Sequence, residues 1–231
     1  MSEFNQNKSF NYSSFSEFCF HIDELPAETR HTVEVLLEMT HVFDYHQAER
    51  ILLKKTQLEL EDCNISDLTP LATLKNLTHL WLYCNDISDL TPLQGLINIT
   101  DLDMSINKIS DIYPLQKLTN LVELNLSDNQ IQNVNPLNNL TKLTSLNLAD
   151  NQITDIKPLS NLVFLEAIDL SNNQISDINP LQSLIKLQQI CLHDNKIFNL
   201  HPLKHLQKAV DIILDSNRIT DLSPLENLTN L

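Results

Sequence analysis

Apolar and polar positions repeat with a fixed period of 22 residues over most of this chain. In each block the third and fifth residues are apolar, the tenth is Ile, and the fifteenth and sixteenth are Pro-Leu. Eight consecutive blocks fill residues 56–231 without insertion or deletion, and a fixed period of this length indicates a repeat architecture. The blocks begin at Thr56, Thr78, Thr100, Val122, Thr144, Glu166, Gln188 and Val210.

Each block predicts one short strand followed by one short helical turn. Alternation around the third and fifth residues, Leu146 and Leu148 in the fifth block, is typical of a strand with one buried face. The Pro has the φ angle that the first position of a helical turn requires. A residue that favours helix capping precedes this Pro in five blocks: Thr69, Thr91, Asn135, Asn179 and Ser223. No single block can bury its apolar side alone, so the blocks must stack into a solenoid with a parallel sheet.

Two polar positions of the block are predicted to support its backbone. The amide of an Asn at the eighth position both donates and accepts hydrogen bonds, so stacked copies can form an interior ladder. Cys63 takes this place in the first block, and the other seven carry Asn85, Asn107, Asn129, Asn151, Asn173, Asn195 and Asn217. An Asp at the twelfth position is expected to bond nearby backbone amides. It occurs as Asp67, Asp89, Asp111, Asp155, Asp177 and Asp221.

The pattern LxLxxNxIxDIxPLxxLxxL resembles the leucine-rich repeat, in the 22-residue class of bacterial internalins and of a eukaryotic protein-phosphatase regulator. The DIxPL form, present at residues 155–159, is closer to the internalin type. The resemblance covers residues 56–231, about three quarters of the chain. It implies an α/β solenoid, a right-handed superhelix with a parallel β-sheet on the concave face and 3₁₀ turns on the convex face.

The residues before the repeats are predicted to form a flexible lead, 1–14, and a helical N-terminal cap, 15–55. One helical pattern opens at Pro26, and a second follows Asp44, which is a suitable cap residue. A solenoid needs its first open core edge covered, and the resemblance implies that helices do so. At the other end Leu231 is a core position. The chain is therefore expected to be a fragment of a longer protein, or to pack there on a second copy.

Composition narrows the classes of partner. The chain has 30 acidic and 15 basic residues and a formal net charge of -15, which repels nucleic acid and anionic membranes and favours a basic or polar protein surface. Its single glycine, Gly95, argues against a phosphate-binding loop. No signal peptide or membrane-spanning apolar run is evident. Because the four cysteines form no CxxC pair, we expect reduced thiols and a cytoplasmic protein, with secretion by a non-standard route as the alternative.

Function is expected at the variable positions beside each apolar pair. The first, second, fourth, sixth and seventh residues of a block are predicted to face the concave side, which gives 40 positions. None of them is Lys or Arg, although the repeats contain ten such residues. Thirteen are acidic: Glu59, Glu61, Asp62, Asp101, Asp103, Glu123, Asp128, Asp150, Glu166, Asp169, Asp194, Asp211 and Asp215. The sequence therefore predicts an acidic concave face.

A protein partner is expected to bind around two aromatic residues of the second block. Trp81 and Tyr83 belong to one strand, with His79 beside them, and exposed aromatic side chains on a rigid surface are common interface anchors. Acidic residues on this and the neighbouring strands would select a basic or polar partner: Glu59, Glu61, Asp101, Asp103 and Glu123. The alternative is that the acids only keep this face soluble and Trp81 packs on its neighbours.

A catalytic interpretation can also be drawn on the concave face. Cys191 and His193 share one strand, and Asp169 and Asp215 lie on the flanking strands. Such an arrangement can generate a thiolate nucleophile. However, an open sheet offers no pocket that excludes water and no evident oxyanion donors. We therefore expect no enzymatic activity.

A metal interpretation is equally weak. Concave acids in one column, such as Asp101 with Glu123 or Asp128 with Asp150, could share a Ca²⁺ ion. Side chains on a flat sheet rarely supply the six or more oxygen ligands that Ca²⁺ takes. We expect no metal and no cofactor.

The sequence thus predicts a non-enzymatic scaffold for protein–protein interaction that binds its partner on the acidic concave face. One alternative is a regulatory subunit that tethers an enzyme such as a phosphatase. Another, implied by the resemblance, is an exported internalin-like adhesin or effector. Self-association through the uncapped C-terminal end is a further expectation.

Overall fold

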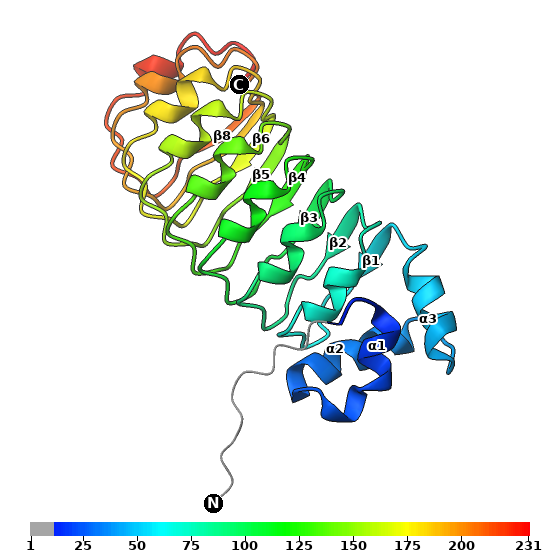
Figure 1. Cartoon of the computed structure of the whole chain (residues 1–231). Coiled ribbons are helices and arrows are strands. Elements are labelled where there is room, and N and C mark those ends of the chain that lie inside the picture. The colour runs from blue at the N-terminus through cyan, green and yellow to red at the C-terminus, as the bar shows by residue number, and fades with distance from the viewer. Residues whose placement is uncertain (1–11) are drawn as a thin grey trace, which may run out of the picture.

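The computed structural model describes residues 12–231 as a curved solenoid with a small helical unit at its N-terminal end (Figure 1). Eight parallel strands form one sheet in chain order, from β1 to β8. The predicted solenoid with a parallel sheet and a helical cap is therefore confirmed. The strands are β1 Gln57–Glu59, β2 His79–Trp81, β3 Asp101–Asp103, β4 Glu123–Asn125, β5 Ser145–Asn147, β6 Ala167–Asp169, β7 Gln189–Cys191 and β8 Asp211–Ile213.

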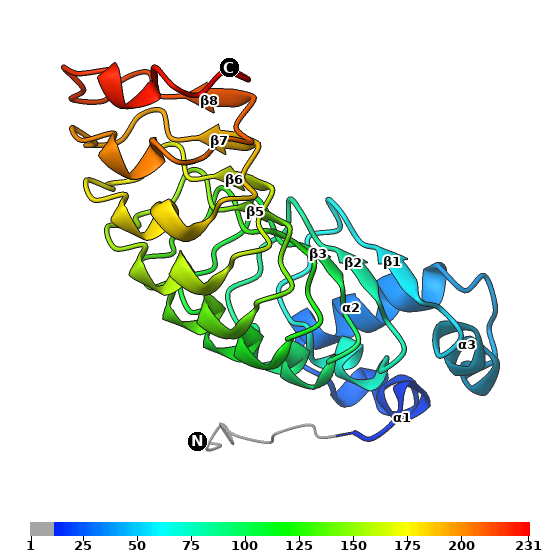
Figure 2. The same ribbon diagram turned by 90° about the horizontal axis from the view of Figure 1, so that it is seen from above.

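Short 3₁₀ helices lie along the side of the solenoid opposite to the sheet (Figure 2). Each follows one strand and has Pro at its first or second position, where the fixed φ of Pro suits a helix start. They are η2 Thr69–Thr73, η3 Thr91–Gly95, η4 Tyr113–Lys117, η5 Asn135–Asn139, η6 Lys157–Asn161, η7 Asn179–Ser183, η8 His201–Leu203 and η9 Ser223–Leu225.

The strand register places equivalent positions of all blocks side by side. Leu58 pairs with Leu80, and Leu124 pairs with Leu146, so the third residues form one continuous row in the core. The third, fifth and tenth residues of the first seven blocks are at most 2% exposed. Burial of each such side chain stabilises the fold by about 1.5–3 kcal/mol. The constant 22-residue period is what keeps every apolar side chain in register.

The N-terminal cap contains α1 Phe15–Phe20, η1 Ile22–Glu24, α2 Ala27–Glu38 and α3 Tyr45–Leu52. Helices α2 and α3 coincide with the two helical patterns of the sequence. The side chain of Asp44 accepts a hydrogen bond from the backbone N–H of Gln47 at 2.7 Å, as expected for a helix cap.

The cap is joined to the first block by polar contacts from α2. Thr29 donates a hydrogen bond to the carboxylate of Asp67, and Thr32 donates to the backbone oxygen of Asp67 at 2.7 Å. His31 Nε2 lies 2.7 Å from the backbone oxygen of Cys63. These contacts supply hydrogen-bond partners at the block in which Cys63 replaces the ladder Asn.

Helix α1 is a feature that the sequence pattern did not single out within the cap. The carboxylate of Glu49, in α3, accepts hydrogen bonds from the backbone N–H of Phe15 and from the hydroxyl of Ser16, both at 2.9 Å. The helix is thus held by a residue far along the chain. Of the predicted lead, residues 1–11 lie outside the described residues, and the ring of Tyr12 packs edge-on against Phe18 with centroids 5.0 Å apart.

The last block leaves its apolar side open to solvent. Leu222 is 63% exposed, whereas the equivalent Leu200 of the preceding block is 1% exposed. Leu231 is 53% exposed, and its equivalent Ala209 is fully buried. A stacked solenoid buries each block only against its neighbours, so the terminal face is exposed. Within residues 12–231, no helix is long and apolar enough to span a membrane.

Candidate partner-binding surface

The solvent-facing side of the sheet carries the candidate site, and its side chains form columns across the strands. In one column His79 pairs with Asp101, which pairs with Glu123. In the next column Trp81 pairs with Asp103. Adjacent strands lie about 4.8 Å apart, so one extended ligand chain could reach side chains of several blocks. The structure therefore brings the predicted binding residues together over β1–β4.

The aromatic residues of this patch are only partly covered. Tyr83 is 39% exposed, and Trp81 is half-buried. The rings of His79 and Trp81 are 5.8 Å apart and tilted by 54°, and His79 Nδ1 lies 2.9 Å from the hydroxyl of Thr78. The indole thus packs against the ring of His79 while part of its surface remains accessible. This geometry combines low side-chain entropy with accessible apolar area, as an interface anchor requires.

Three carboxylates beside the rings have no partner in the fold. Glu59, Asp101 and Glu123 make no side-chain hydrogen bond or ion pair with any other residue of the described part of the chain. No Lys or Arg occupies the concave positions, so no cation of the same face neutralises them. These three groups are available to a cationic partner.

Two other concave acids are engaged in the fold, Asp103 of the predicted site and Asp169 outside it. Asp103 accepts hydrogen bonds from the backbone N–H of Ser105 at 2.8 Å and from its hydroxyl at 2.6 Å. Asp169 makes the same pair of bonds to Ser171. An Asp at the fourth position therefore closes the turn after the strand, whereas Glu59 at the same position of the first block does not. Glu61 differs again, because its Oε2 is buried without a hydrogen-bond partner among residues 12–231, which is uncommon for a polar group.

The eighth-position Asn side chains bridge successive blocks. The amide of Asn151 donates to the backbone oxygens of Leu126, Leu148 and Ala149 at 3.0–3.2 Å, and its oxygen accepts from the N–H of Ile131 at 2.9 Å. The same bonds recur from Asn85 to Asn217. Each Asn thus satisfies backbone groups of its own block and of the preceding one.

The start of each 3₁₀ helix is capped by the twelfth residue and not by the fourteenth. Asp155 accepts a hydrogen bond from the backbone N–H of Lys157 at 2.8 Å, and the other five twelfth-position Asp residues make the equivalent bond. The predicted capping by Thr69, Thr91, Asn135, Asn179 and Ser223 is wrong, because each lies inside its helix and makes no side-chain cap bond. Short Asp side chains bond amides two residues on, so this position is structural.

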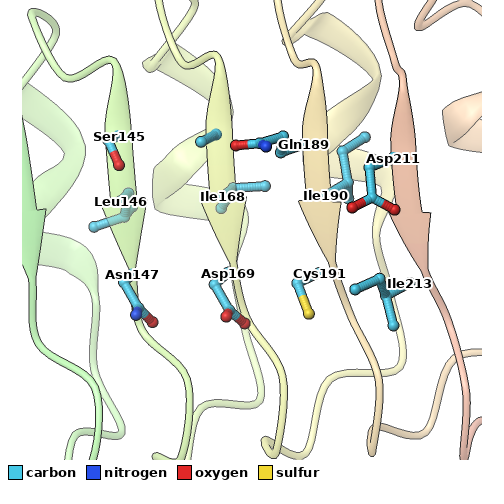
Figure 3. A pocket seen from close by; sticks show the side chains of 11 residues that line it. Ser145, Leu146, Asn147, Ile168, Asp169, Gln189, Ile190, Cys191, Asp211 and Ile213 are labelled. Carbon is cyan, nitrogen blue, oxygen red and sulfur yellow. The ribbon is translucent and has the colours of Figure 1, made fainter.

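A shallow hollow lies on the same face over β5–β8, farther from the cap (Figure 3). Its floor combines small second-position residues, Ser145 and Ala167, with Asn147, Asp169 and Cys191 of the fourth column. This hollow was not predicted from the sequence. The sequence feature that could have indicated it is the pair of small residues at the second position of two consecutive blocks, Ser145 and Ala167, which leaves space between the larger side chains around them.

The contacts of Cys191 and His193 do not favour a thiolate nucleophile. His193 Nδ1 lies 2.9 Å from a carboxylate oxygen of Asp194, its chain neighbour. Burial raises the pKa of the Cys191 thiol above its ordinary value, and the nearby carboxylate of Asp169 raises this pKa further. A thiol with a raised pKa is a poor nucleophile at neutral pH.

The acidic columns do not assemble a metal site. No group of three or more His, Cys, Asp or Glu side chains within residues 12–231 is placed to hold a metal ion. The paired residues Asp101 and Glu123 lie side by side in register, but two carboxylates supply fewer oxygens than Ca²⁺ requires.

Asp150 and Asp194 are the seventh residues of their blocks, and their charges are expected to affect stability in opposite directions. Burial and the charge of Asp128 raise the pKa of Asp150, whereas hydrogen bonds from His193 and Ser216 lower the pKa of Asp194. The ionised form of Asp150 is therefore less favourable in the folded than in the unfolded chain, and that of Asp194 is more favourable. We expect Asp150→Asn to raise, and Asp194→Asn to lower, the urea midpoint at neutral pH.

The Asp150 difference should disappear below the ordinary pKa of Asp, where this side chain is uncharged in both states. The Asp194 difference should persist to lower pH and disappear only below the lowered pKa of the folded state, because the folded side chain is still ionised at the ordinary pKa of Asp. Both residues have a left-handed backbone with φ of 53–54°, so the two substitutions are matched in their backbone effect. Equal shifts of the two variants at neutral pH would contradict the assigned charge environments.

Comparisons with known proteins agree with this geometry. The profile of the family described as leucine-rich repeats (two copies) matches five overlapping segments, 56–95, 75–117, 97–139, 119–161 and 141–183. The search of curated proteins gave no match.

Several solved structures share the fold. Internalin C2 of Listeria monocytogenes is 34% identical, with a TM-score of 0.81, over 86% of this chain and 88% of that one. Internalin InlF of the same species is 29% identical, with a TM-score of 0.73, over 91% of this chain and 69% of that one. A plant peptide hormone receptor in complex with RGF2 is 29% identical, with a TM-score of 0.64, over 72% of this chain and 29% of that one. The chain belongs to the leucine-rich repeat family, and its repeats are of the internalin-like type.

Proposed function

We propose that this protein binds a partner protein on its concave face and has no enzymatic activity of its own. The leucine-rich repeat fold is a scaffold for protein–protein interaction. One structural neighbour is a receptor in complex with a peptide hormone. The rigid columns of side chains on the sheet suit such a role, because they are held in place before a partner arrives and little entropy is lost on binding.

The observation that carries the proposal is the set of unpaired carboxylates around accessible rings. Glu59, Asp101 and Glu123 have no partner in the described fold, and Trp81 and Tyr83 lie between them on β2 and just after it. Glu61, Asp103 and His79 complete the patch. We therefore propose a partner segment that presents Lys or Arg next to an aromatic or aliphatic side chain.

Removal of the two rings is expected to weaken binding of such a segment strongly. The probe is a set of random-sequence peptides displayed on phage and selected on the wild-type protein. For the selected peptides, the double variant Trp81→Ala/Tyr83→Ala should lower the affinity by about 30-fold, the effect of losing roughly 2 kcal/mol at a central anchor. Affinity for the wild type should also fall as salt is raised, because screening weakens attraction between exposed charges.

Tyr113→Ala is the matched control for this experiment. Tyr113 is 62% exposed and opens η4 on the opposite side of the solenoid, so its removal should leave peptide binding unchanged. Selected peptides without basic residues, or equal affinity for the wild type and the double variant, would overturn the proposal. Capture of one stoichiometric enzyme from a cell extract would instead favour the regulatory-subunit alternative.

A further inference from the structure

The seventh residue of every block has the same unusual backbone conformation. All eight have φ between 52° and 57°, in the left-handed region that side chains other than Gly rarely adopt. The residues are Asp62, Cys84, Ile106, Asp128, Asp150, Asn172, Asp194 and Ser216. Five of them are Asp or Asn, which tolerate this region because their short polar side chains bond locally. The scaffold therefore requires a left-handed residue at this position.

Ile106 is the residue that does not suit this requirement. Its Cβ is branched, and a branched side chain in the left-handed region is strained. The conformation is fixed by the ladder on both sides, because Ile106 N donates to the backbone oxygen of Ser127 at 3.0 Å and its oxygen accepts from the N–H of Asn85 at 3.2 Å. The strain thus cannot relax by a local change of the backbone.

Packing does not compensate for the strain at Ile106. The side chain is 50% exposed, so half of its apolar surface remains in water. An Asn or Asp, as found in most other blocks, would fit the backbone better and would expose no apolar surface. Ile106 is therefore unfavourable for stability because of its backbone strain and because of its exposed apolar surface. Residues with a strained backbone cluster at functional sites.

The position of Ile106 connects it with the aromatic patch. Ile106 directly follows Ser105, whose backbone oxygen accepts from the N–H of Cys84, the residue after Tyr83. Both Tyr83 and Ile106 expose apolar surface on the same edge of the concave face. Charged groups border this edge. Asp128 occupies the same seventh position in the next block, where its backbone oxygen accepts from the N–H of Asn107, and Asp86 and Lys108 form an ion pair with a separation of 2.6 Å.

We propose that Ile106 is a specificity-determining contact that receives an apolar side chain of the partner segment, next to the basic residue that the carboxylates bind. The proposal rests on the function proposed above. It identifies the occupant as a protein segment with an aliphatic or aromatic side chain close to Lys or Arg. The acidic rim supplies the charge complementarity for the basic residue, and Tyr83 with Ile106 supplies the apolar surface for its neighbour.

Ile106→Asn is the substitution that tests this inference, because it should move stability and binding in opposite directions. Relief of the left-handed strain should raise the thermal midpoint by about 2–4 °C, the shift that a gain of about 1 kcal/mol gives in a chain of this size. The affinity for the phage-selected peptides should fall by about tenfold. Ile106→Val, which keeps the branched apolar side chain, should retain binding and should not raise the midpoint.

Ile185→Asn is the control, because Ile185 is 60% exposed and its φ is not positive. It should change neither the thermal midpoint nor the affinity. If Ile106→Asn binds the selected peptides as well as the wild type while Trp81→Ala/Tyr83→Ala does not, the role of Ile106 is overturned and the proposed function stands. If both variants bind like the wild type, both proposals fail. A midpoint that does not rise would overturn the strain argument.

Discussion

Asn151→Ala is expected to lower the free energy of unfolding by about 3–5 kcal/mol, because it removes four hydrogen bonds from the interior. The N–H of Ile131 would lose its acceptor, and a buried N–H without a partner costs about 1–3 kcal/mol. The oxygens of Leu126, Leu148 and Ala149 would each lose one donor but keep another, from Asn129, Asn173 and the N–H of Asp128. Those three losses cost less, about 0.5–1.5 kcal/mol each.

Urea unfolding followed by far-ultraviolet circular dichroism measures this change. Asn161→Ala is the matched control, since Asn161 lies on the exposed side of η6 and its substitution should stay within about 0.5 kcal/mol. Equal midpoints for the two variants would show that the interior ladder does not stabilise the solenoid.

The second large effect is expected from core leucines, and it should depend on their place along the solenoid. Leu148 is fully buried between two neighbouring blocks, so Leu148→Ala should cost about 2–5 kcal/mol in lost burial and cavity formation. Leu214 occupies the same position in the last block but is only partly buried. Because no block lies beyond it in the structure, Leu214→Ala should cost about 1 kcal/mol, scaled to its smaller buried area.

The pair of leucine variants also tests the state of the open end in solution. Urea midpoints of both variants should be compared at several protein concentrations, together with the sedimentation coefficient. A loss for Leu214→Ala as large as that for Leu148→Ala, with a sedimentation coefficient above that of the monomer, would mean that a second copy covers the last block.

Much of the fold was predictable because each block repeats the same residue types at the same positions. The Leu pair, the ladder Asn, the Ile and the Pro-Leu pair each have a backbone role that depends only on residues within one or two blocks. Helix α1 has only a local cap, in which the side chain of Ser14 accepts from the N–H of Glu17 at 3.3 Å. Its first turn is otherwise held by Glu49, more than 30 positions away, which accepts from the N–H of Phe15 and the hydroxyl of Ser16. A six-residue helix that depends on a long-range partner cannot be identified from local periodicity.

The candidate site was less predictable, since acidic residues with different roles look alike in a sequence. In the sequence the thirteen concave acids form one group. In the structure Asp103 and Asp169 close turns, and the acids at the seventh position have a left-handed backbone. Glu59, Asp101 and Glu123 remain without partners in the described fold. Only the hydrogen-bond geometry separates acids that the backbone requires from acids that are available for a ligand.

The sequence by itself determined the period, the strand and 3₁₀ positions, the register of the core and the absence of cations from the concave columns, because these follow from residue type and spacing. The tertiary structure alone decided which carboxylates are engaged, how far Trp81 and Tyr83 are exposed and that Ile106 is held in a strained conformation. These properties depend on where neighbouring blocks place their backbone groups. Contacts between distant segments, and not local patterns, set them.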